Sequence, residues 1–336
     1  MRIGIIGFGY WGPNLYRNFS THPECSVVAI ADSSPLKREQ IKRLNERLLV
    51  FEDGKNLIDR PEVDAVVVAS PVATHYPLAK YAIEKGKPVL VEKPICASTD
   101  EAQELVEYAR RNDVPLMVDH TFLFNGAVQM IRDMYQRGEL GTISYYDSMR
   151  VNLGLFQPDV SVLWDLAPHD FSIIRFILGE EPIYYEGSGY CHVNDHLPDI
   201  VYVTAYFPSN VVAHFNLSWM SPVKVRRTAI GGSEKMVVWD DLDRDEPIRI
   251  YNSGIKVQPS EQRAAIIPSY RIGDVLAPRV RAPEPLSRVV NHFIKVIKKQ
   301  EHPIMSGEDG LAIVRMLEKA HAAVEMSSRR YNSSRQ

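Results

Sequence analysis

Three residues of types that move protons or stabilise charge, Lys93, Asp165 and His169, are the candidates for catalysis in this chain of 336 residues. Lys93 follows the apolar stretch 89–91, so its ammonium can hydrogen-bond a reacting oxygen and stabilise charge there. Histidine is the commonest general acid or base. Asp165 lies four residues before His169, so on a helix the two side chains share one face. The set suits an alcohol oxidation, which needs a base for the hydroxyl proton, and its reverse, which needs an acid.

Each of these residues also has a structural interpretation. Lys93 can be a surface lysine paired with Glu92. Asp165 can cap its helix while His169 packs in the core, because Asp is a good N-cap and Pro168 is near enough to a helix start. Capping and catalysis are compatible for Asp165. We predict that His169 exchanges the proton and that Lys93 polarises the reacting oxygen, and the opposite assignment stays open.

A glycine-rich turn near the start of the chain predicts a dinucleotide site. Residues 7–12 fit G-x-G-x-x-G between a strand-like and a helix-like stretch. The first glycine permits a tight turn, the second lets a pyrophosphate approach the backbone, and the third lets the helix pack closely, with free N–H groups at its start. Asp32, 20 residues after Gly12, can accept hydrogen bonds from the adenosine ribose. The predicted cofactor residues at this end are Gly7, Phe8, Gly9, Tyr10, Trp11, Gly12, Asp32 and Ser33.

The charge of Asp32 favours NAD over NADP, because a carboxylate repels a 2′-phosphate. The residues around it keep NADP open. Ser33, Ser34, Lys37 and Arg38 can reach a phosphate if the loop turns toward it. We therefore predict NAD as the cofactor, with NADP as the alternative.

The elements that must position these residues change character along the chain. In the first third, strand-like and helix-like stretches alternate, a helix is predicted over 36–49, and the stretch 65–69 is apolar on both faces, which predicts a mainly parallel sheet. After about Thr121 several stretches alternate polar and apolar residues, as antiparallel or mixed strands do. We place a dinucleotide-binding domain at 1–121 and a substrate-binding and oligomerisation domain at 122–336.

Motifs in both halves together resemble the glucose–fructose oxidoreductase/inositol dehydrogenase/MocA (Gfo/Idh/MocA) family. Glu92-Lys93-Pro94 follows the fifth strand, Ser70-Pro71 and Thr74-His75 follow the fourth, and the run 165–170 is similar to the family's Asp-x-x-x-His pattern. The resemblance implies a Rossmann domain followed by an α/β domain with a large open, mostly antiparallel sheet. It implies hydride transfer between a nicotinamide cofactor and a carbinol carbon of a sugar, cyclitol or related polyol. It also implies a homodimer or homotetramer formed through the open face of that sheet.

The resemblance adds site residues. Near the nicotinamide it implies Ser70, Pro71, Thr74, His75, Glu92 and Lys93, with Thr74 and His75 alternatively capping the next helix. Candidate substrate contacts are Lys93, His120, Asn152, Asp165 and His169. Each of the weaker candidates can equally be a satisfied polar residue at the core rim. The family's Asn-Arg-Arg-Phe-like run is absent from 119–125, so we expect a different substrate-facing wall.

The irregular segment 253–285 carries Tyr270, Arg271, Arg279 and Arg281. Arginine suits phosphate, so we hypothesise that Tyr270 and Arg271 bind the pyrophosphate of a nucleotide-linked sugar, while a solvated or interface loop is equally compatible. Proteins resembling this one often serve surface-polysaccharide or deoxysugar synthesis, with chemistry at a sugar C3. We therefore predict a sugar or nucleotide-sugar C3 dehydrogenase or ketoreductase. The rival functions are a glycoside hydrolase or eliminase that oxidises its sugar transiently with NAD, and a non-catalytic NAD(P)-binding sensor.

Composition and charge exclude other classes. With 39 Lys and Arg against 42 Asp and Glu, the net charge of −3 argues against nucleic-acid binding. The three widely spaced cysteines suit a reducing cytosol, and the longest purely apolar runs have five residues, so we expect a cytoplasmic protein without a membrane span. His192 and His196 flank Asp195 without a third ligand pair nearby, so we expect no metal site.

Overall fold

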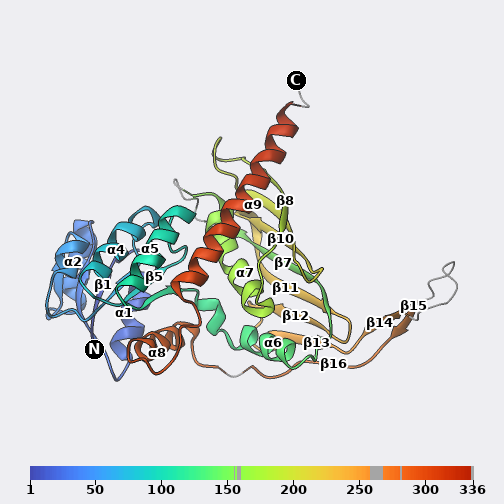
Figure 1. Cartoon of the computed structure of the whole chain (residues 1–336), viewed down its shortest axis with the longest axis horizontal. Coiled ribbons are helices and arrows are strands. Elements are labelled where there is room, and N and C mark those ends of the chain that lie inside the picture. Colours follow the sequence, from blue (N-terminus) through green and yellow to red (C-terminus); the bar gives the residue numbers. More distant parts are fainter. Residues whose placement is uncertain (155, 157–159, 258–267, 281, 334–336) are drawn as a thin grey trace. The chain divides into compact units, whose positions relative to one another are not determined.

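The computed structural model describes residues 1–154, 156, 160–257, 268–280 and 282–333. The chain forms two compact units, Met1–Phe124 with Pro283–Arg315, and Asn125–Ala282 with Met316–Gln336. The first crossing between them lies three residues from the predicted boundary at 121/122. The segment Pro283–Arg315, which we assigned to the second domain, is part of the first unit instead. It holds α8 (Pro285–Ile297), which packs beside α1 (Gly12–Thr21), as Figure 1 shows.

The first unit is built on a six-stranded sheet in the order β3-β2-β1-β4-β5-β6, and all its strand pairs are parallel. The order reverses between β1 and β4, which is the arrangement of a Rossmann domain. The predicted parallel sheet is confirmed. Its strands are β1 (Arg2–Ile6), β2 (Ser26–Ala31), β3 (Leu49–Phe51), β4 (Ala65–Val68), β5 (Val89–Glu92) and β6 (Leu116–Asp119). Its other elements are α2 (Pro35–Leu44), α3 (Gly54–Ile58), α4 (His75–Glu84), α5 (Thr99–Arg111) and the 3₁₀ turns Val72–Thr74 and Thr121–Phe124.

The helix that we predicted over 36–49 is too long. The helix α2 ends at Leu44, and the strand β3, which we did not predict, pairs with β2 from Leu49 onward. Leu48 lies between the two elements and is buried, so its apolar side chain extended the helical spacing beyond the real end of the helix.

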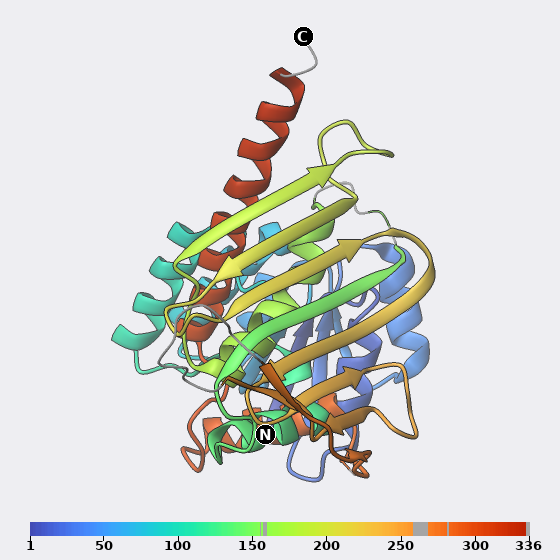
Figure 2. The same ribbon diagram turned by 90° about the vertical axis from the view of Figure 1, so that its right-hand side faces the viewer.

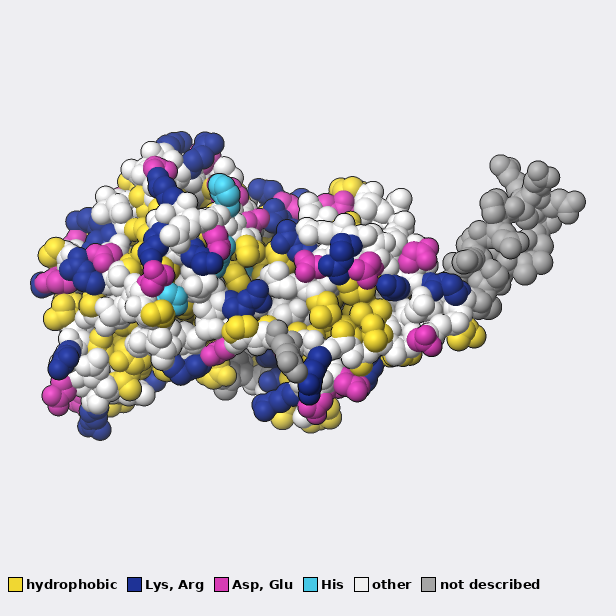
Figure 3. Space-filling view, turned by 90° about the horizontal axis from the view of Figure 1, so that it is seen from below, with side chains coloured by type: hydrophobic (Ala, Val, Ile, Leu, Met, Phe, Trp, Pro, Cys, Tyr) yellow, Lys and Arg dark blue, Asp and Glu magenta, His cyan; other side chains and the backbone are white. Residues whose placement is uncertain are grey.

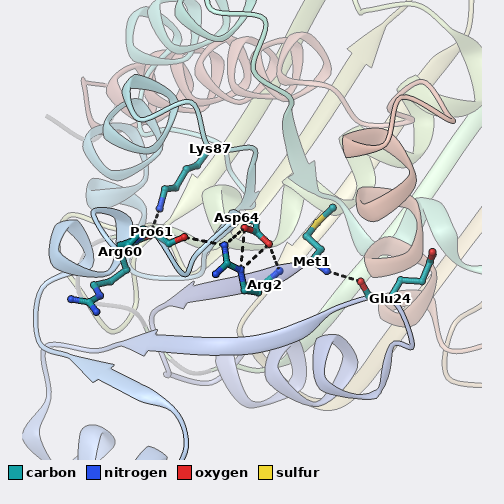
Figure 4. Close-up of polar contacts among 7 residues, drawn as sticks. All are labelled: Met1, Arg2, Glu24, Arg60, Pro61, Asp64 and Lys87. Atoms are coloured by element: carbon teal, nitrogen blue, oxygen red, sulfur yellow. Dashed lines mark hydrogen bonds and ion pairs between the residues drawn. The ribbon is translucent and has the colours of Figure 1, made fainter.

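Polar contacts between exposed and half-buried groups lie at the amino edge of this sheet (Figure 4). Arg2, the first residue of β1, donates from Nη2 to Asp64 Oδ1 at 2.7 Å and to the carbonyl of Pro61 at 3.0 Å. The main-chain N–H of Arg2 also donates to Asp64 Oδ2, at 2.7 Å. Lys87, which precedes β5, donates to the carbonyl of Arg60 at 2.7 Å. These contacts tie together the starts of β1, β4 and β5.

The second unit holds an eight-stranded sheet in the order β16-β13-β12-β11-β7-β10-β9-β8, where only the pair β7 and β10 is parallel. The predicted open, mostly antiparallel sheet is confirmed, and Figure 2 looks onto one of its faces. Its strands are β7 (Ile143–Leu153), β8 (Tyr184–Tyr190), β9 (Ile200–Tyr206), β10 (Val212–Ser218), β11 (Met220–Gly232), β12 (Met236–Asp240), β13 (Ile248–Tyr251) and β16 (Val275–Leu276). The segment that we predicted to be irregular contains β16 and the ribbon of β14 (Gly254–Val257) and β15 (Pro268–Arg271).

A buried ion pair fixes α7 (Val162–Leu178) on this sheet. Asp170 is fully buried, and its two oxygens accept hydrogen bonds from Nε and Nη2 of Arg150 on β7, each at 2.9 Å. Ser148 donates to the same carboxylate at 3.0 Å. Because the pair is buried and well bonded, separating its partners is costly, and α7 is held in one position on β7. The remaining helices are α6 (Gly126–Gln136) and α9 (Gly307–Ser333), which begins in the first unit and ends in the second.

Within the ranges described, no helix is both long enough and apolar enough to cross a membrane.

Candidate cofactor and catalytic site

The three glycines of the turn after β1 have three different environments. Gly7 has φ of +97°, and a Cβ there would lie 2.4 Å from the carbonyl oxygen of Ala69. A Cβ on Gly12 would lie 2.5 Å from the carbonyl oxygen of Gly7. At Gly9, by contrast, a Cβ would meet no atom within 4 Å. The turn therefore needs glycine at its two ends, and its exposed middle leaves the backbone open, which fits the approach of a pyrophosphate.

Asp32 is half-buried and ties the end of β2 to this turn. Its Oδ2 accepts the N–H of Phe8 at 2.7 Å, and its Oδ1 accepts the N–H of Ser34 at 2.9 Å. Arg38, which could serve NADP, donates to the carbonyls of Asp32 and Ser33 at 3.0 and 2.8 Å and pairs with Glu52 at 3.1 Å. Because the guanidinium is engaged by protein acceptors, this edge fits the ribose of NAD better than a 2′-phosphate.

The loop after β4 is braced by its own side chains and by His75. The hydroxyls of Ser70 and Thr74 lie 2.6 Å apart, and Thr74 also donates to the carbonyl of Pro71 at 2.7 Å. His75 is buried, with Nδ1 2.8 Å from the carbonyl oxygen of Pro94 and Nε2 2.8 Å from that of Ser70. Burial lowers the pKa of His75. The ring thus lies between the loops after β4 and β5, and as a neutral imidazole it donates to one of the two carbonyls and packs against the other, next to the turn that carries Lys93.

The next two strands end in a pair of carboxyl groups. Glu92 ends β5 directly opposite Asp119, which ends β6, and Asp119 Oδ1 accepts the hydroxyl of Thr121 at 2.6 Å. Burial and the charge of Asp119 raise the pKa of Glu92 well above its usual value. Burial also raises the pKa of Asp119. Lys93 follows Glu92 and begins a turn with a cis peptide bond to Pro94.

Asp119 is a candidate site residue that the sequence analysis did not predict. The signal was present, because an acidic residue ended an apolar strand at the edge where α/β proteins bind ligands. His120, the predicted substrate contact that follows it, is buried.

In the second unit, Asp165 and His169 lie one helical turn apart on α7, on the same face, and both are half-buried. The suggestion that Asp165 caps the helix is wrong, because α7 begins at Val162 and its N-cap is Ser161. Asp165 Oδ2 instead accepts the indole N–H of Trp219 at 3.3 Å. Trp219 is buried and was not predicted from the sequence, since nothing in its neighbourhood indicated a partner 54 residues away.

The other predicted substrate contacts of the second unit are placed as follows. Asn152 lies near the end of β7 and donates to the carbonyl of Leu153 at 3.0 Å. Tyr270 belongs to β15 and pairs with Ile255 of β14. The guanidinium of Arg271 donates to the carbonyl of Asn252 at 3.2 Å and also to the side chain of Asn252 and the carbonyl of Glu234. Arg271 therefore ties β15 to the main sheet. Arg281 lies outside the described residues.

Metal-ligating side chains and the distribution of surface charge indicate which classes of ligand the protein could bind. In the part of the chain that the structure describes, no group of three or more His, Cys, Asp or Glu side chains could hold a metal ion. His192, considered for such a site, has Nδ1 2.7 Å from Asp199 Oδ1. On the face drawn in Figure 3, acidic and basic side chains are interspersed, which matches the small net charge.

Comparisons with known proteins agree with this geometry. Residues 1–120 match the model of an oxidoreductase family with an NAD-binding Rossmann fold, and residues 128–238 match the Gfo/Idh/MocA C-terminal domain. The chain therefore belongs to a class of NAD-binding oxidoreductases. It is a member of the Gfo/Idh/MocA family, as its motifs predicted.

Relatives in this family act on different substrates. A UDP-N-acetylglucosamine 3-dehydrogenase of Acidithiobacillus ferrooxidans is 27% identical, over 97% of both chains. A myo-inositol 2-dehydrogenase of Thermotoga maritima is 24% identical, over 92% of both chains. Two other curated relatives, 29% and 28% identical, are matched over only 56% and 51% of their own length. A solved protein structure from Magnetospirillum magnetotacticum is 29% identical, with a TM-score of 0.81 over 95% of this chain and 99% of that one.

Proposed function

We propose that this protein is an NAD-dependent dehydrogenase or ketoreductase acting on a carbinol or keto carbon of a sugar. The observation that carries the proposal is the carboxyl edge of the Rossmann sheet. There an open glycine turn, Asp32 and Lys93 follow the ends of β1, β2 and β5 in a member of an oxidoreductase family. Bound NAD supplies or accepts the hydride.

The chain's own residues have distinct tasks in this proposal. Gly9 keeps the backbone open to the pyrophosphate, and the first N–H groups of α1 bind it. Asp32 accepts hydrogen bonds from the ribose hydroxyls. Ser70, Thr74 and Glu92 border the nicotinamide side, and His75 acts on it only through the two carbonyls that its ring contacts.

Lys93 and His169 both act on the reacting hydroxyl, but in different ways. His169 takes it during oxidation and returns it during reduction, while the Lys93 ammonium hydrogen-bonds the oxygen and stabilises its developing charge. Asp165, whose carboxylate is held by Trp219, orients the imidazole or the substrate. The buried pair of Arg150 and Asp170 supports this by fixing α7.

The variants Lys93→Met and His169→Ala test these roles. We expect each to lower kcat/KM by about 10²- to 10⁴-fold, which is the usual contribution of a positioned acid, base or polarising group. Binding of NADH, followed by its fluorescence, should persist. Lys42→Met, at an exposed position of α2, is the matched control with normal activity. Full activity of Lys93→Met on an identified substrate would contradict the assignment.

For the substrate we favour a nucleotide-linked sugar oxidised at C3, in surface-polysaccharide or deoxysugar synthesis. The support is the full-length similarity to a UDP-N-acetylglucosamine 3-dehydrogenase, and the similarity to a myo-inositol 2-dehydrogenase makes cyclitols the comparison class. A panel of sugars, nucleotide sugars and cyclitols, assayed at the absorbance band of the reduced nicotinamide with NAD and NADP in both directions, decides between them. Turnover of cyclitols alone would refute the nucleotide-sugar specificity.

The predicted role of Arg271 in this specificity has its own test. Its guanidinium is already bound to Asn252 and to the carbonyl of Glu234, so binding a pyrophosphate would require it to exchange those partners. Unchanged affinity of Arg271→Ala for a nucleotide sugar would remove the role.

We further propose a cytoplasmic homodimer or homotetramer formed through the large sheet. Side chains alternate along its strands, and one face exposes apolar and aromatic groups, among them Tyr145, Met149, Tyr184, Tyr202 and Val212. Figure 2 shows this sheet with its strands in the foreground. Contiguous exposed apolar surface of this kind marks an association site. Tyr202→Glu should shift the mass measured by light scattering toward the monomer, and an unchanged mass would exclude this face.

A further inference from the structure

A pair of carboxyl groups, the half-buried Glu92 and the buried Asp119, lies at the carboxyl edge of the Rossmann sheet. The two residues are direct partners in the parallel pair of β5 and β6, so their side chains project from the same face of the sheet. Asp119 is 2% exposed. We propose that Glu92 and Asp119 share one proton at neutral pH and that this proton leaves when oxidised nicotinamide, a cation, binds beside them.

The hydrogen bonds of the pair favour a shared proton. One oxygen of each carboxyl group has a donor, because Thr121 donates to Asp119 Oδ1 at 2.6 Å and the N–H of Lys93 to Glu92 Oε2 at 3.3 Å. Glu92 Oε1 and Asp119 Oδ2 are buried and have no donor among the residues that the structure describes. Two ionised carboxylates can only accept hydrogen bonds. A single proton lets one carboxyl group donate a hydrogen bond to the other, which gives both of these oxygens a partner.

The surroundings decide which member carries the proton. Burial raises the pKa of both groups, and the charge of Asp119 raises that of Glu92 further. Hydrogen bonding from Thr121 lowers the pKa of Asp119, and the nearby Trp11 indole acts in the same direction. Glu92 is therefore the acid and Asp119 the ionised acceptor, so that the pair carries one negative charge.

Among the described residues, few other charges act on the pair. Lys93 follows Glu92, and its positive charge favours ionisation of that group. His120, next to Asp119, is buried. From α9, whose start packs against β6, Asp309 accepts hydrogen bonds from the main chain and hydroxyl of Ser306. Lys93 is thus the cation that helps to hold the negative charge of the pair.

The link to the cofactor rests on the proposed function. A Rossmann domain binds a dinucleotide across the point where the strand order reverses, here between β1 and β4. With Asp32, which directly follows β2, at the adenosine ribose, the nicotinamide half extends over the ends of β4, β5 and β6. A positive charge beside a carboxyl pair favours its ionised form.

The proton balance follows from these charges. The free protein, with one proton on the pair, binds NAD⁺ and releases that proton to the solvent. Reduced nicotinamide carries no positive charge, so its complex keeps the proton. The pair therefore regains a proton from solvent within each oxidation cycle, and the overall reaction still releases one proton, that of the substrate hydroxyl.

Infrared spectroscopy of the free protein in D₂O tests the first half of the proposal. A protonated buried carboxyl gives a carbonyl band separate from those of carboxylates and amides. We expect this band at neutral pH in the wild type and its loss in Glu92→Gln. We also expect its loss in Asp119→Asn, whose amide can donate to Glu92. Glu104→Gln, an exposed glutamate of α5, should keep the band. A wild type without the band, or a band that persists in both pair variants, overturns the shared proton.

Calorimetric titration with NAD⁺ and NADH, in two buffers of different ionisation enthalpy, tests the second half. We expect a release of up to one proton with NAD⁺, none with NADH, and none with either in Glu92→Gln. Equal release with both cofactors overturns the coupling. Neither experiment contains a sugar, so a failure to find a substrate would count against the proposed function alone. A protein that binds neither cofactor would refute that function and the coupling, while the infrared band would still decide the shared proton.

Discussion

The two edges of the Rossmann sheet carry different polar groups at the ends of its parallel strands. An exposed ion pair lies at the amino edge, and a pair of carboxyl groups lies at the carboxyl edge. At the amino edge, Arg2 and Asp64 satisfy one another through several hydrogen bonds, with 47% and 41% of their side chains exposed. At the carboxyl edge, Glu92 is half-buried and Asp119 is buried, and each keeps one buried oxygen without a donor from the described part of the protein. Both edges belong to the same strands with the same pairing, so they differ only in the polar side chains at the strand ends.

This difference separates stability from function. Exposed ion pairs contribute little free energy and can be lost cheaply. Buried groups with unmet hydrogen bonds and raised pKa values are costly, and proteins keep them mainly where ligands bind or chemistry occurs. A substitution at the carboxyl edge should therefore change folding, cofactor binding and pH dependence together, whereas one at the amino edge should change folding slightly and nothing else.

The largest effect is expected from Gly7→Ala at the carboxyl edge. A non-glycine residue at a positive φ costs about 1–3 kcal/mol, and here the added Cβ would also press against main-chain atoms of Ala69, which cannot move independently of β4. We expect a loss of about 3 kcal/mol or more in the free energy of unfolding, measured with urea, because the two costs add.

Gly9→Ala is the matched control for this substitution. Its Cβ would meet no atom within 4 Å, so the stability should change by less than about 1 kcal/mol. Its affinity for NADH should nevertheless fall, since the methyl group would stand where the pyrophosphate approaches. Equal stability losses in both variants would show that the turn is only a structural connection.

His75→Ala is expected to have the next largest effect. The substitution removes the ring that lies between the carbonyls of Ser70 and Pro94 and leaves the one to which it donates without that donor, which costs about 1–3 kcal/mol of unfolding free energy. The turn at Lys93 should also lose its fixed position, so kcat should fall beyond what the stability change explains. His196→Ala, at an exposed position, is the control and should do neither. Normal kcat in a folded His75→Ala protein would refute the positioning role.

These residues also show what the sequence could predict. The glycine turn, Asp32 and the strand preceding Lys93 follow local rules of spacing and burial, so their elements were predictable. His75 and Trp219 act through partners 19 and 54 residues away, and that pairing depends on how loops and strands meet in space. The pairing of Glu92 with Asp119 likewise requires the register of β5 and β6, which no local pattern encodes. No local pattern encodes the assignment of Pro283–Arg315 to the first unit either.

A smaller effect is expected from Glu92→Gln, and it should be recognised by the sign of the change in the pH dependence of stability. A carboxyl whose pKa is raised by folding binds its proton more tightly in the native state. Stability therefore falls as the pH rises from the ordinary value near 4.5 through the raised pKa, at about 1.4 kcal/mol per pH unit for one proton. The variant should lack this decline and be more stable than the wild type in alkaline buffer. Parallel stability curves for the two proteins would mean that Glu92 is ionised in the native state.

The smallest effect is expected from Asp64→Asn at the amino edge, and its pH dependence should have the opposite sign. Hydrogen bonding from Arg2 lowers the pKa of Asp64, so its contribution is present above the ordinary value of 3.8 and is lost as the pH falls through the lowered pKa. Because both side chains are well exposed, the loss at neutral pH should be about 1 kcal/mol or less and should shrink further in high salt. Urea unfolding at two salt concentrations measures it, with NADH affinity as the second readout. A loss beyond about 2 kcal/mol, or a weakened NADH complex, would mean that the amino edge also supports the cofactor site, because an exposed pair alone cannot account for either.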